Sequence, residues 1–355
     1  MKALYFGTYD RTSPRNTQVV SCLRRAGVTV VERHREVWGR HNWSVGVRQL
    51  ARMARAEGAL ARRREDDADV VLVGYPGHFD MPAARRAARG RPLVFNPLVS
   101  LHDTLVGDRA RFRPRSAAAG VLRGIDHVAF RSADLVVADT AAHAAYFRQA
   151  FDLPAERVAV VLVGADEPLF GPGWHPPEPF HVLFVGKLIP LHGVETILAA
   201  AALLPDVPFR VVGDGQLSGL LAQRPANVEH VPWIPYTELP EAYRAAGCAL
   251  GIFGTGAKTA RVIPNKVFQG LACGRPVITA DTPAARELLS HGMDALLVPA
   301  GDPEALAAAV WQIAGDPRLA RRLADAGRAT YETRASEEVL GAQWRSLLER
   351  AAVRR

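Results

Sequence analysis

Cationic and amide side chains gather around the start of one predicted helix in the second half of the chain. They are Lys258, Arg261, Asn265, Lys266 and Gln269. Lys266 and Gln269 are three positions apart and therefore share a face of the first helical turn. The free N–H groups at a helix N-terminus suit a phosphate group, and a lysine there adds charge. Because the helix continues as Leu-Ala-Cys between apolar strands, unlike an exposed surface helix, the segment predicts an anion-binding site.

Two earlier loops in the same half also combine glycine with polar residues directly after a predicted strand. The first contains Gly186 and Lys187 and reaches His192 before a helix begins. The second contains Gly213 and Asp214. Glycine at a strand end lets a ligand approach the backbone. The second loop differs by one residue from the dinucleotide fingerprint, and no acidic residue closes the following strand, so NAD binding is disfavoured.

The first half has weaker candidates of the same kind. Gly7 and Thr8 follow the first predicted strand, and His102 and Asp103 lie in a loop after a central one. A buried structural histidine is the alternative interpretation of His102, but its place after a strand end favours a functional role. Further polar residues that flank a strand and could line an acceptor are Arg131, Asp134, Asp139 and Thr140.

Short β-branched runs alternate with alanine-rich helical stretches in both halves, which is typical of parallel sheets with crossover helices. The runs are apolar on both faces, as buried parallel strands are. The predicted strands are Ala3–Phe6, Val28–Val31, Val70–Gly74, Leu93–Asn96, Leu135–Ala138 and Val158–Val163, then His181–Val185, Phe209–Val212, Val228–Val231, Ala249–Phe253, Val277–Thr279 and Ala295–Val298.

The pattern predicts an α/β protein with two doubly wound, Rossmann-like units that face a central cleft, where open parallel sheets bind ligands. A segment rich in proline and glycine separates the two series of strands and can form neither helix nor central strand. We therefore expect domains at 1–170 and 181–335 with a linker at 171–180. The last stretch, 336–355, is expected to form a helix that crosses back to the first domain.

Length and composition limit the class of protein. The chain has 355 residues, 48% of them hydrophobic and 23% charged, which is typical of a soluble globular protein. It contains no apolar stretch long enough to span a membrane and no signal-like N-terminal segment, so a cytoplasmic location is expected. The three cysteines are far apart and are expected to be buried thiols.

The net charge of +8 comes from arginine, because only four of the 44 basic residues are lysines. The arginines of Arg62-Arg63-Arg64 and Arg85-Arg86 are expected to be solvated helix faces. Arginines are not interleaved with aromatic residues as in nucleic-acid-binding proteins. The loop from Arg109 to Arg115 could instead bind an anionic acceptor or the inner membrane face, so peripheral membrane contact is kept as an expectation.

Taken in order, the motifs of the second half resemble the C-terminal domain of GT-B glycosyltransferases of family 4. The series runs FVGKL-x3-HG, VVGDG, PW-x9-Y, PNK-x2-Q-x2-ACG-x-PVI and ELL-x-HG-x-DALLVPAGDPEALA. The resemblance is strong over 180–335 and rests on architecture and a few local motifs over 1–175. It implies transfer of a sugar from a nucleotide-sugar donor to a hydroxyl acceptor with retention of configuration, without metal or cofactor.

The resemblance also implies roles for individual residues. Lys187 occupies the place of a first phosphate-binding cation and His192 that of a second, weaker and pH-sensitive one. Arg261 and Gln269 stand where the family has two glutamates; Lys258 and Arg261 could add charge for the diphosphate. His102, Asp103 and Lys187 are the expected catalytic residues. The expected donor-binding residues are Gly7, Thr8, Gly186, Lys187, His192, Gly213, Asp214, Trp233, Ile234, Lys258, Arg261, Asn265, Lys266, Val267 and Gln269.

Other functions are compatible with the same outline. A nucleotide-sugar 2-epimerase needs paired carboxylates in the cleft, and the two glutamate positions here have lost theirs. A sugar phosphorylase would use Lys258 or Lys266 to hold pyridoxal phosphate but is a far longer protein. A two-lobed solute-binding protein would carry a signal peptide. A catalytically inactive, nucleotide-sugar-binding subunit is the alternative that the missing glutamates favour most.

Overall fold

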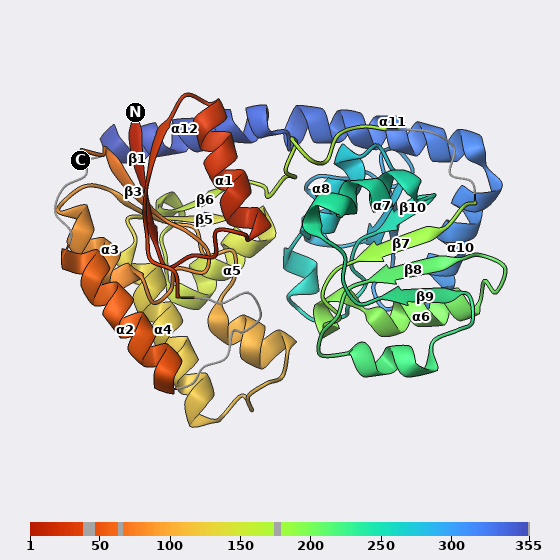
Figure 1. Ribbon diagram of the computed structural model, residues 1–355, viewed down its shortest axis with the longest axis horizontal. Coiled ribbons are helices and arrows are strands. Elements are labelled where there is room, and N and C mark those ends of the chain that lie inside the picture. Colours follow the sequence, from red (N-terminus) through yellow and green to blue (C-terminus); the bar gives the residue numbers. More distant parts are fainter. Residues whose placement is uncertain (38–46, 63–66, 174–178, 354–355) are drawn as a thin grey trace. The chain divides into compact units, whose positions relative to one another are not determined.

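Each half of the chain builds one six-stranded parallel sheet in the computed structural model, which describes residues 1–37, 47–62, 67–173 and 179–353 (Figure 1). The chain divides into two units. Unit 1 comprises Met1–Val106, Ala110–Leu162 and Glu337–Arg355, and unit 2 comprises Gly107–Arg109 and Val163–Ser336. Both are Rossmann-like α/β units, so the predicted fold class is confirmed. No helix of the described segments is long and apolar enough to cross a membrane.

The sheet of unit 1 has the strand order β2-β1-β3-β4-β5-β6. Central strands are buried on both faces, whereas the edge strands β2 and β6 are partly exposed, contrary to the expectation that all would be buried. An edge strand has a neighbour on one side only and needs fewer apolar residues. The strands are β1 (Lys2–Gly7), β2 (Thr29–His34), β3 (Val70–Val73), β4 (Leu93–Phe95), β5 (Leu135–Ala138) and β6 (Val158–Val160).

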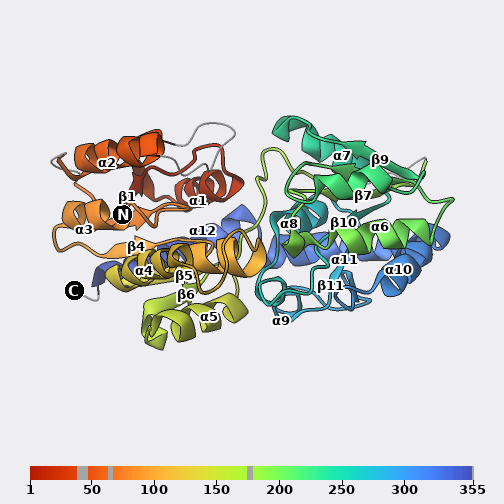
Figure 2. The same cartoon turned by 90° about the horizontal axis from the view of Figure 1, so that it is seen from below.

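Helices cover both faces of this sheet because side chains alternate between the faces along each strand. Leu4 and Phe6 face a core formed with α2 to α5, which lie side by side in that order (Figure 2). Ala3 and Tyr5 face a second core formed with α1 and α12. The helices are α1 (Pro14–Arg25), α2 (Val47–Arg62), α3 (Met81–Ala88), η1 (Asp103–Asp108), α4 (Ala117–Ser132), α5 (Ala141–Phe151), η2 (Ala155–Arg157) and α12 (Glu337–Val353).

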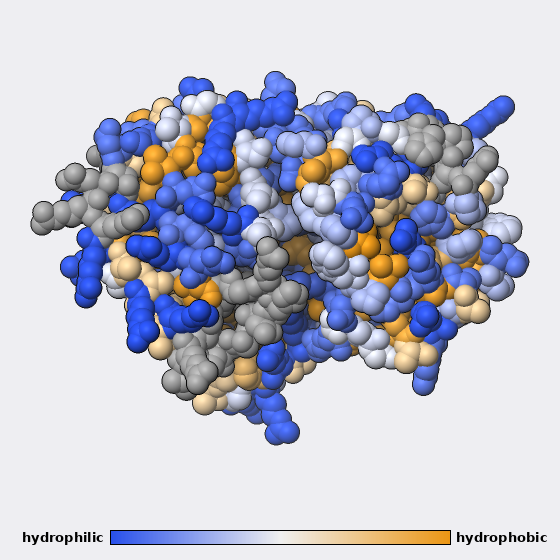
Figure 3. Space-filling model, in the orientation of Figure 1, coloured by the Kyte–Doolittle hydropathy of each residue, from blue (hydrophilic) through white to orange (hydrophobic). Residues whose placement is uncertain are grey.

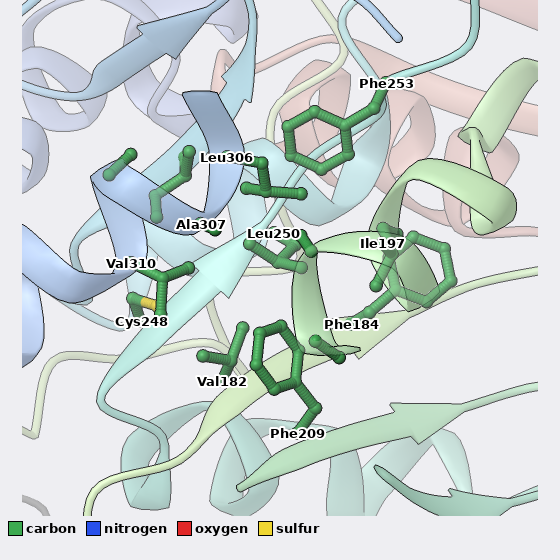
Figure 4. Close-up of a cluster of buried hydrophobic side chains, with 14 of the residues drawn as sticks. Val182, Phe184, Ile197, Phe209, Cys248, Leu250, Phe253, Leu306, Ala307 and Val310 are labelled. Carbon is green, nitrogen blue, oxygen red and sulfur yellow. The ribbon is translucent and has the colours of Figure 1, made fainter. Parts of the chain in front are cut away.

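The sheet of unit 2 has the order β12-β11-β10-β7-β8-β9, so β7 and β10 lie at its centre. Their side chains pack with α6 and α10 in one continuous core, of which Figure 4 shows Phe184, Leu250 and Val310. The strands are β7 (Val182–Val185), β8 (Phe209–Val212), β9 (Val228–Val231), β10 (Cys248–Leu250), β11 (Val277–Ala280) and β12 (Leu296–Val298). The helices are η3 (Pro190–His192), α6 (Val194–Ala202), η4 (Ser218–Gln223), η5 (Tyr236–Glu238), α7 (Leu239–Ala245), η6 (Thr259–Arg261), α8 (Asn265–Ala272), α9 (Pro283–Arg286), α10 (Pro303–Gly315) and α11 (Pro317–Arg334).

The division between the units differs from the expected linker. It falls at Leu162–Val163 and not at residue 170. Phe170 is fully buried against Tyr236 and Tyr243, and the guanidinium of Arg275 donates to the carbonyl of Gly173 at 2.5 Å. These contacts join the start of the expected linker to unit 2. Residues 174–178 of that linker, and residues 63–64 of the first arginine run, lie outside the described residues.

Candidate functional site

The end of β7 is where the described part of unit 2 brings three predicted site residues together. Gly186 follows β7 with φ +155°, a conformation that L side chains rarely adopt. A Cβ atom there would lie 2.7 Å from Nζ of Lys266 and 3.2 Å from Cε1 of His192. The absence of a side chain at Gly186 is therefore what lets the Lys266 ammonium reach this strand end.

Lys266 extends from the first turn of α8 and is only 5% exposed. Its ammonium lies 4.8 Å from the ring centre of Phe184, at cation–π distance, and 3.1 Å from Nε2 of His192. Burial lowers the pKa of this lysine to about 7. Removal from water disfavours the charged form, and no described carboxylate pairs with the ammonium.

His192 does not have the predicted character of a second, pH-sensitive cation. It is buried, and its Nδ1 contacts the carbonyl oxygen of Lys187, which can only accept a hydrogen bond. Burial first, and then the neighbouring Lys266 ammonium, hold the pKa of His192 well below its usual range. The imidazole is therefore neutral near pH 7, with hydrogen on Nδ1 and the lone pair of Nε2 directed at Lys266.

Gly213 follows β8 and lies directly beside the loop that follows β7. Its φ is +134°, and a Cβ atom would overlap the carbonyl oxygen of Gly186. The Asp214 side chain forms a local turn, accepting from the Gly215 N–H at 2.7 Å and from the Ser218 hydroxyl. These hydrogen bonds lower the pKa of the exposed Asp214 carboxyl group. The loop thus shapes the strand end mainly through its backbone.

Gln269 is held within the domain and is not directed into open space as a ribose ligand would be. It is 5% exposed, and its Oε1 accepts from the hydroxyl of Tyr243 at 3.1 Å. Burial raises the pKa of Tyr236 to about 12, and the neighbouring Gln269 amide opposes part of this rise. The amide is therefore engaged by two tyrosines, which the sequence spacing could not indicate.

The remaining predicted residues of unit 2 differ in exposure. Lys187 and Trp233 are exposed, Trp233 by 74%. Partly buried are Ile234, Arg261 and Asn265, and Lys258 and Val267 are buried. Pro264 precedes α8 as its N-cap. The described residues contain no group of three or more His, Cys, Asp or Glu side chains that could hold a metal ion.

In unit 1, the loop after β1 is fixed by a carboxylate that the sequence did not point to. Asp80 accepts from both the N–H and the hydroxyl of Thr8, each at 2.8 Å. A Cβ atom on Gly7, where φ is +131°, would overlap the same carboxylate. Thr8 is 2% exposed. Its hydroxyl therefore donates within unit 1, and the donor-binding role of Thr8 stays a prediction.

Asp126 of α4 fixes the loop that carries His102 in a similar way. Its carboxylate accepts from the Ser100 hydroxyl at 2.6 Å and from the N–H groups of Leu101 and His102 at 2.9 Å. The Asp103 N–H donates in turn to Ser100 Oγ at 3.0 Å. Asp126 is fully buried, and sequence reasoning missed it. Its spacing with the apolar Ala129 and Phe130 on one helix face was the available signal.

The weaker acceptor candidates do not share one location. Asp134 precedes β5, at the amino end of the strand, where it pairs with Arg85 at 3.0 Å. Arg131 lies nearby at the end of α4 and pairs with Asp152. Asp139 follows β5 but bonds Nδ1 of the buried His143 at 2.6 Å. Thr140 caps α5. The role of these four residues as acceptor ligands therefore stays a prediction.

Two family models match the chain. The description "Glycosyl transferases group 1" matches residues 179–316, and "Glycosyl transferase 4-like domain" matches residues 7–164. These ranges correspond to most of unit 2 and most of unit 1.

Curated relatives are similar over part of their length. The chain is 30% identical over 232 residues to D-inositol 3-phosphate glycosyltransferase of Thermobispora bispora, covering 55% of this chain and 51% of that protein. It is 26% identical over 183 residues to the lipopolysaccharide core biosynthesis glycosyltransferase LpsD of Rhizobium meliloti, covering 51% and 52%. The chain thus spans about half the length of the curated relatives it matches.

Solved structures match over the whole chain. Sucrose-phosphate synthase from Thermosynechococcus elongatus has a TM-score of 0.77 at 18% identity and covers 100% of this chain and 99% of its own. Anabaena HepE, solved in complex with UDP-glucose, has a TM-score of 0.70 at 19% identity and covers 98% and 99%. The fold of these neighbours is GT-B, as the sequence resemblance implied.

Proposed function

The chain belongs to the group 1 glycosyl transferases, and from this premise we propose that it transfers a sugar from a nucleotide-sugar donor to a hydroxyl group of an acceptor. HepE, of the same fold, has been solved with UDP and with UDP-glucose, which supports a donor of that chemical class. The curated relatives are glycosyltransferases by name, which supports the same reaction class.

The observation that carries the proposal is the buried Lys266 ammonium at the end of β7. A cation taken out of water is costly unless an anion accompanies it. No described carboxylate pairs with Lys266, and its single hydrogen-bond acceptor is the neutral His192. The N-terminal turn of α8 adds free N–H groups, including those of the first helical residues, Asn265 and Lys266. A diphosphate would supply the missing negative charge, and the exposed Lys187 can contribute from the β7 loop.

We further propose that the transfer retains the anomeric configuration. The bond from the anomeric carbon to the donor phosphate oxygen breaks, the acceptor oxygen bonds to the same face of that carbon, and the leaving phosphate takes the acceptor proton. Lys187 and Lys266 stabilise the charge on the phosphate. His102 orients the sugar, and its backbone carbonyl partly shields positive charge that develops on the ring.

A thermal-shift screen with UDP-, GDP- and dTDP-sugars tests donor binding, because a ligand of the native state raises the melting temperature. Acceptor-dependent release of nucleotide then tests transfer, and the proton coupling constant of the product gives its configuration. Binding without release of nucleotide would favour the second candidate, an inactive nucleotide-sugar-binding subunit. Arg261 and the tyrosine-bound Gln269 at the two glutamate positions favour that candidate. An inverted product would overturn the mechanism.

We propose that lysines, and neither a metal ion nor a cofactor, balance the donor charge. Turnover should therefore persist in EDTA, and loss of turnover that Mn²⁺ or Mg²⁺ restores would refute this.

For the acceptor, the exposed Arg111, Arg113 and Arg115 of the loop from Arg109 to Arg115 favour an anionic or lipid-linked molecule. Sedimentation with anionic vesicles at low and high salt tests whether this loop binds an anionic lipid surface. Salt screens the attraction between arginines and anionic lipids, so binding should weaken as the salt concentration rises. Absence of binding at low salt would leave an acceptor that is not bound to lipid.

A further inference from the structure

The pair formed by His192 and Lys266 supports an inference that rests on the proposed function and concerns how the donor is bound. We propose that His192 acts as a neutral hydrogen-bond acceptor that holds the Lys266 ammonium at the end of β7, so that Lys266 alone of the pair binds the donor diphosphate and gains a proton as it does so. Donor affinity would then depend on pH through Lys266.

Both ring nitrogens of His192 are already used. Nδ1 contacts the carbonyl oxygen of Lys187, and a carbonyl cannot donate, so the hydrogen of the neutral ring is on Nδ1. Nε2 lies 3.1 Å from an ammonium, which cannot accept, so Nε2 is the acceptor. No nitrogen is left to donate to a phosphate oxygen. The ring edge also contacts Phe184, at 5.7 Å between ring centres, which fixes its orientation.

Three features fix the position of Lys266. Its helix begins beside the strand end, the Phe184 ring lies 4.8 Å from its ammonium, and the missing side chain of Gly186 leaves the space that the ammonium fills. His192 accepts one of the three ammonium hydrogens. The other two hydrogens can be donated to an anion that binds at the loop after β7, which begins at Gly186. The lysine is thus oriented before the donor arrives, which lowers the entropy cost of binding.

Burial makes the Lys266 ammonium easy to deprotonate, and positively charged neighbours help to keep His192 neutral. Lys258, from the loop before α8, and Arg109 both act on His192 in the direction that disfavours a positive charge. No described carboxylate pairs with Lys266, and burial brings the pKa of this lysine to about 7. A bound diphosphate stabilises the charged form and so raises that pKa. The affinity for the diphosphate is therefore highest below about pH 7. Above that pH the free lysine is mostly neutral, and the affinity falls by up to about tenfold per pH unit.

Nuclear magnetic resonance on the full chain tests the pair directly, because the chain has only four lysines. In the free protein we expect the ¹⁵N shifts of His192 to show hydrogen on Nδ1 alone from pH 6 to 9. The ¹³Cε signal of Lys266 should titrate near pH 7. A doubly protonated His192 at pH 6.5, or a Lys266 midpoint near 10, would overturn the proposal.

Calorimetry with UDP-glucose, whose diphosphate does not itself titrate from pH 6 to 9, tests the consequence for binding. We expect proton uptake at pH 8 and a dissociation constant that rises about tenfold from pH 7 to 8.5. Unchanged affinity over this range would overturn the pH dependence. If UDP-glucose and the other sugar nucleotides all fail to bind, the proposed function and the donor part of this inference fall, whereas the ¹⁵N spectrum still decides the pairing.

Two variants separate positioning from phosphate binding by His192. His192→Gln keeps an acceptor for Lys266 and a donor for the Lys187 carbonyl, so UDP-glucose affinity at pH 7 should stay within about threefold. His192→Leu removes both and should weaken binding about tenfold, the worth of one charged hydrogen bond. Equal losses in the two variants, with both folded by circular dichroism, would contradict a positioning role.

Discussion

At the scale of single residues, the two lysines at the β7 loop differ in how much each can contribute. An exposed ammonium is screened by water and counter-ions, whereas a buried one interacts through a less polar medium. Lys187 is exposed and Lys266 is 5% exposed. We therefore expect the buried lysine to be the stronger phosphate ligand, although Lys187 is the one in the place where the family resemblance puts a cation.

The first prediction compares these lysines. Lys266→Met should weaken nucleotide-sugar binding by about 1.5–3 kcal/mol, the range for a hydrogen bond to a charged group. Lys187→Ala should cost less, roughly 0.5–1 kcal/mol. Calorimetric dissociation constants at pH 6.5 measure both, with Lys2→Ala in unit 1 as the control. A larger effect of Lys187 than of Lys266 would reverse their proposed importance.

The second prediction concerns Asp126, which positions His102. Asp126→Asn replaces an acceptor of three hydrogen bonds by an amide with one acceptor oxygen. The His102 loop should lose its fixed geometry, and kcat should fall roughly tenfold or more, while donor affinity stays close to that of the unchanged protein. His102→Ala should show the same separation, typical of a contact made mainly in the transition state.

Steady-state kinetics together with calorimetry check the effect of Asp126→Asn. Since the substitution also lowers stability, both are measured well below the melting temperature of the variant. A parallel loss of donor affinity would indicate a general structural defect instead.

Much of this residue-level arrangement was not accessible from sequence. Lys266 and Gly186 could be placed at the site because each follows a strand or opens a helix. The role of His192 depends on a partner 74 positions away along the chain, and that of Gln269 on two tyrosines of another helix and turn. Local spacing carries no information about such contacts, so His192 was predicted to be a cation and Gln269 a donor-binding residue.

At the scale of elements, all twelve strands were predictable, with ends that differ by a few residues. Continuous apolar runs separated by helical stretches have few alternatives to a parallel sheet. Ends were less certain: the run Val158–Val163 pairs only over Val158–Val160. The apolar run continues beyond the last paired residue, and Val161 and Val163 of this continuation are buried. The burial of Val161 and Val163 was thus readable from the sequence, whereas the exposure of Val160 and the end of the hydrogen-bond pairing were not.

The third prediction concerns the approach of the loops after β7 and β8. Gly213→Ala would bring a Cβ atom into the carbonyl oxygen of Gly186, at a φ that alanine rarely adopts. Because backbone must move, the free energy of unfolding should fall by about 2 kcal/mol or more. Gly219→Ala is the matched control, since nothing lies within 4 Å of its added Cβ and its change should stay within about 0.5 kcal/mol.

Chemical denaturation measures both glycine variants, and binding of nucleotide sugar shows whether the strand end also moves. A Gly213→Ala protein as stable as the control would show that the loops can separate at little cost.

At the scale of the whole molecule, the net charge of +8 does not come from the site alone. Hydrophilic side chains predominate on the face shown in Figure 3. Many arginines are paired along helices, as Arg321 with Asp325 and Arg345 with Glu349. Such exposed pairs add little stability. The buried, unbalanced charge at Lys266 therefore says more about function than the total charge does.

The chain also returns to its first unit at its end. Helix α12 belongs to unit 1, where it packs against α1. A Cβ atom on Gly341 would lie 2.5 Å from the carbonyl oxygen of Cys22, which shows how closely the two helices approach. Trp344 of α12 is fully buried, and the Arg15 guanidinium lies 5.8 Å from its ring centre. The last helix is thus part of the core of unit 1.

The fourth prediction tests that dependence with two tryptophans. Trp344→Ala should destabilise unit 1 by about 3–5 kcal/mol, because it leaves a large cavity between α12 and the sheet. Trp311→Ala on α10 of unit 2 is the matched control, since Trp311 is 63% exposed and its loss should change stability little. Hydrogen exchange should become faster in α1 of the Trp344 variant and remain unchanged in α10. If α10 exchanged as fast as α1, the two units would unfold together, and the last helix would support the whole chain and not unit 1 alone.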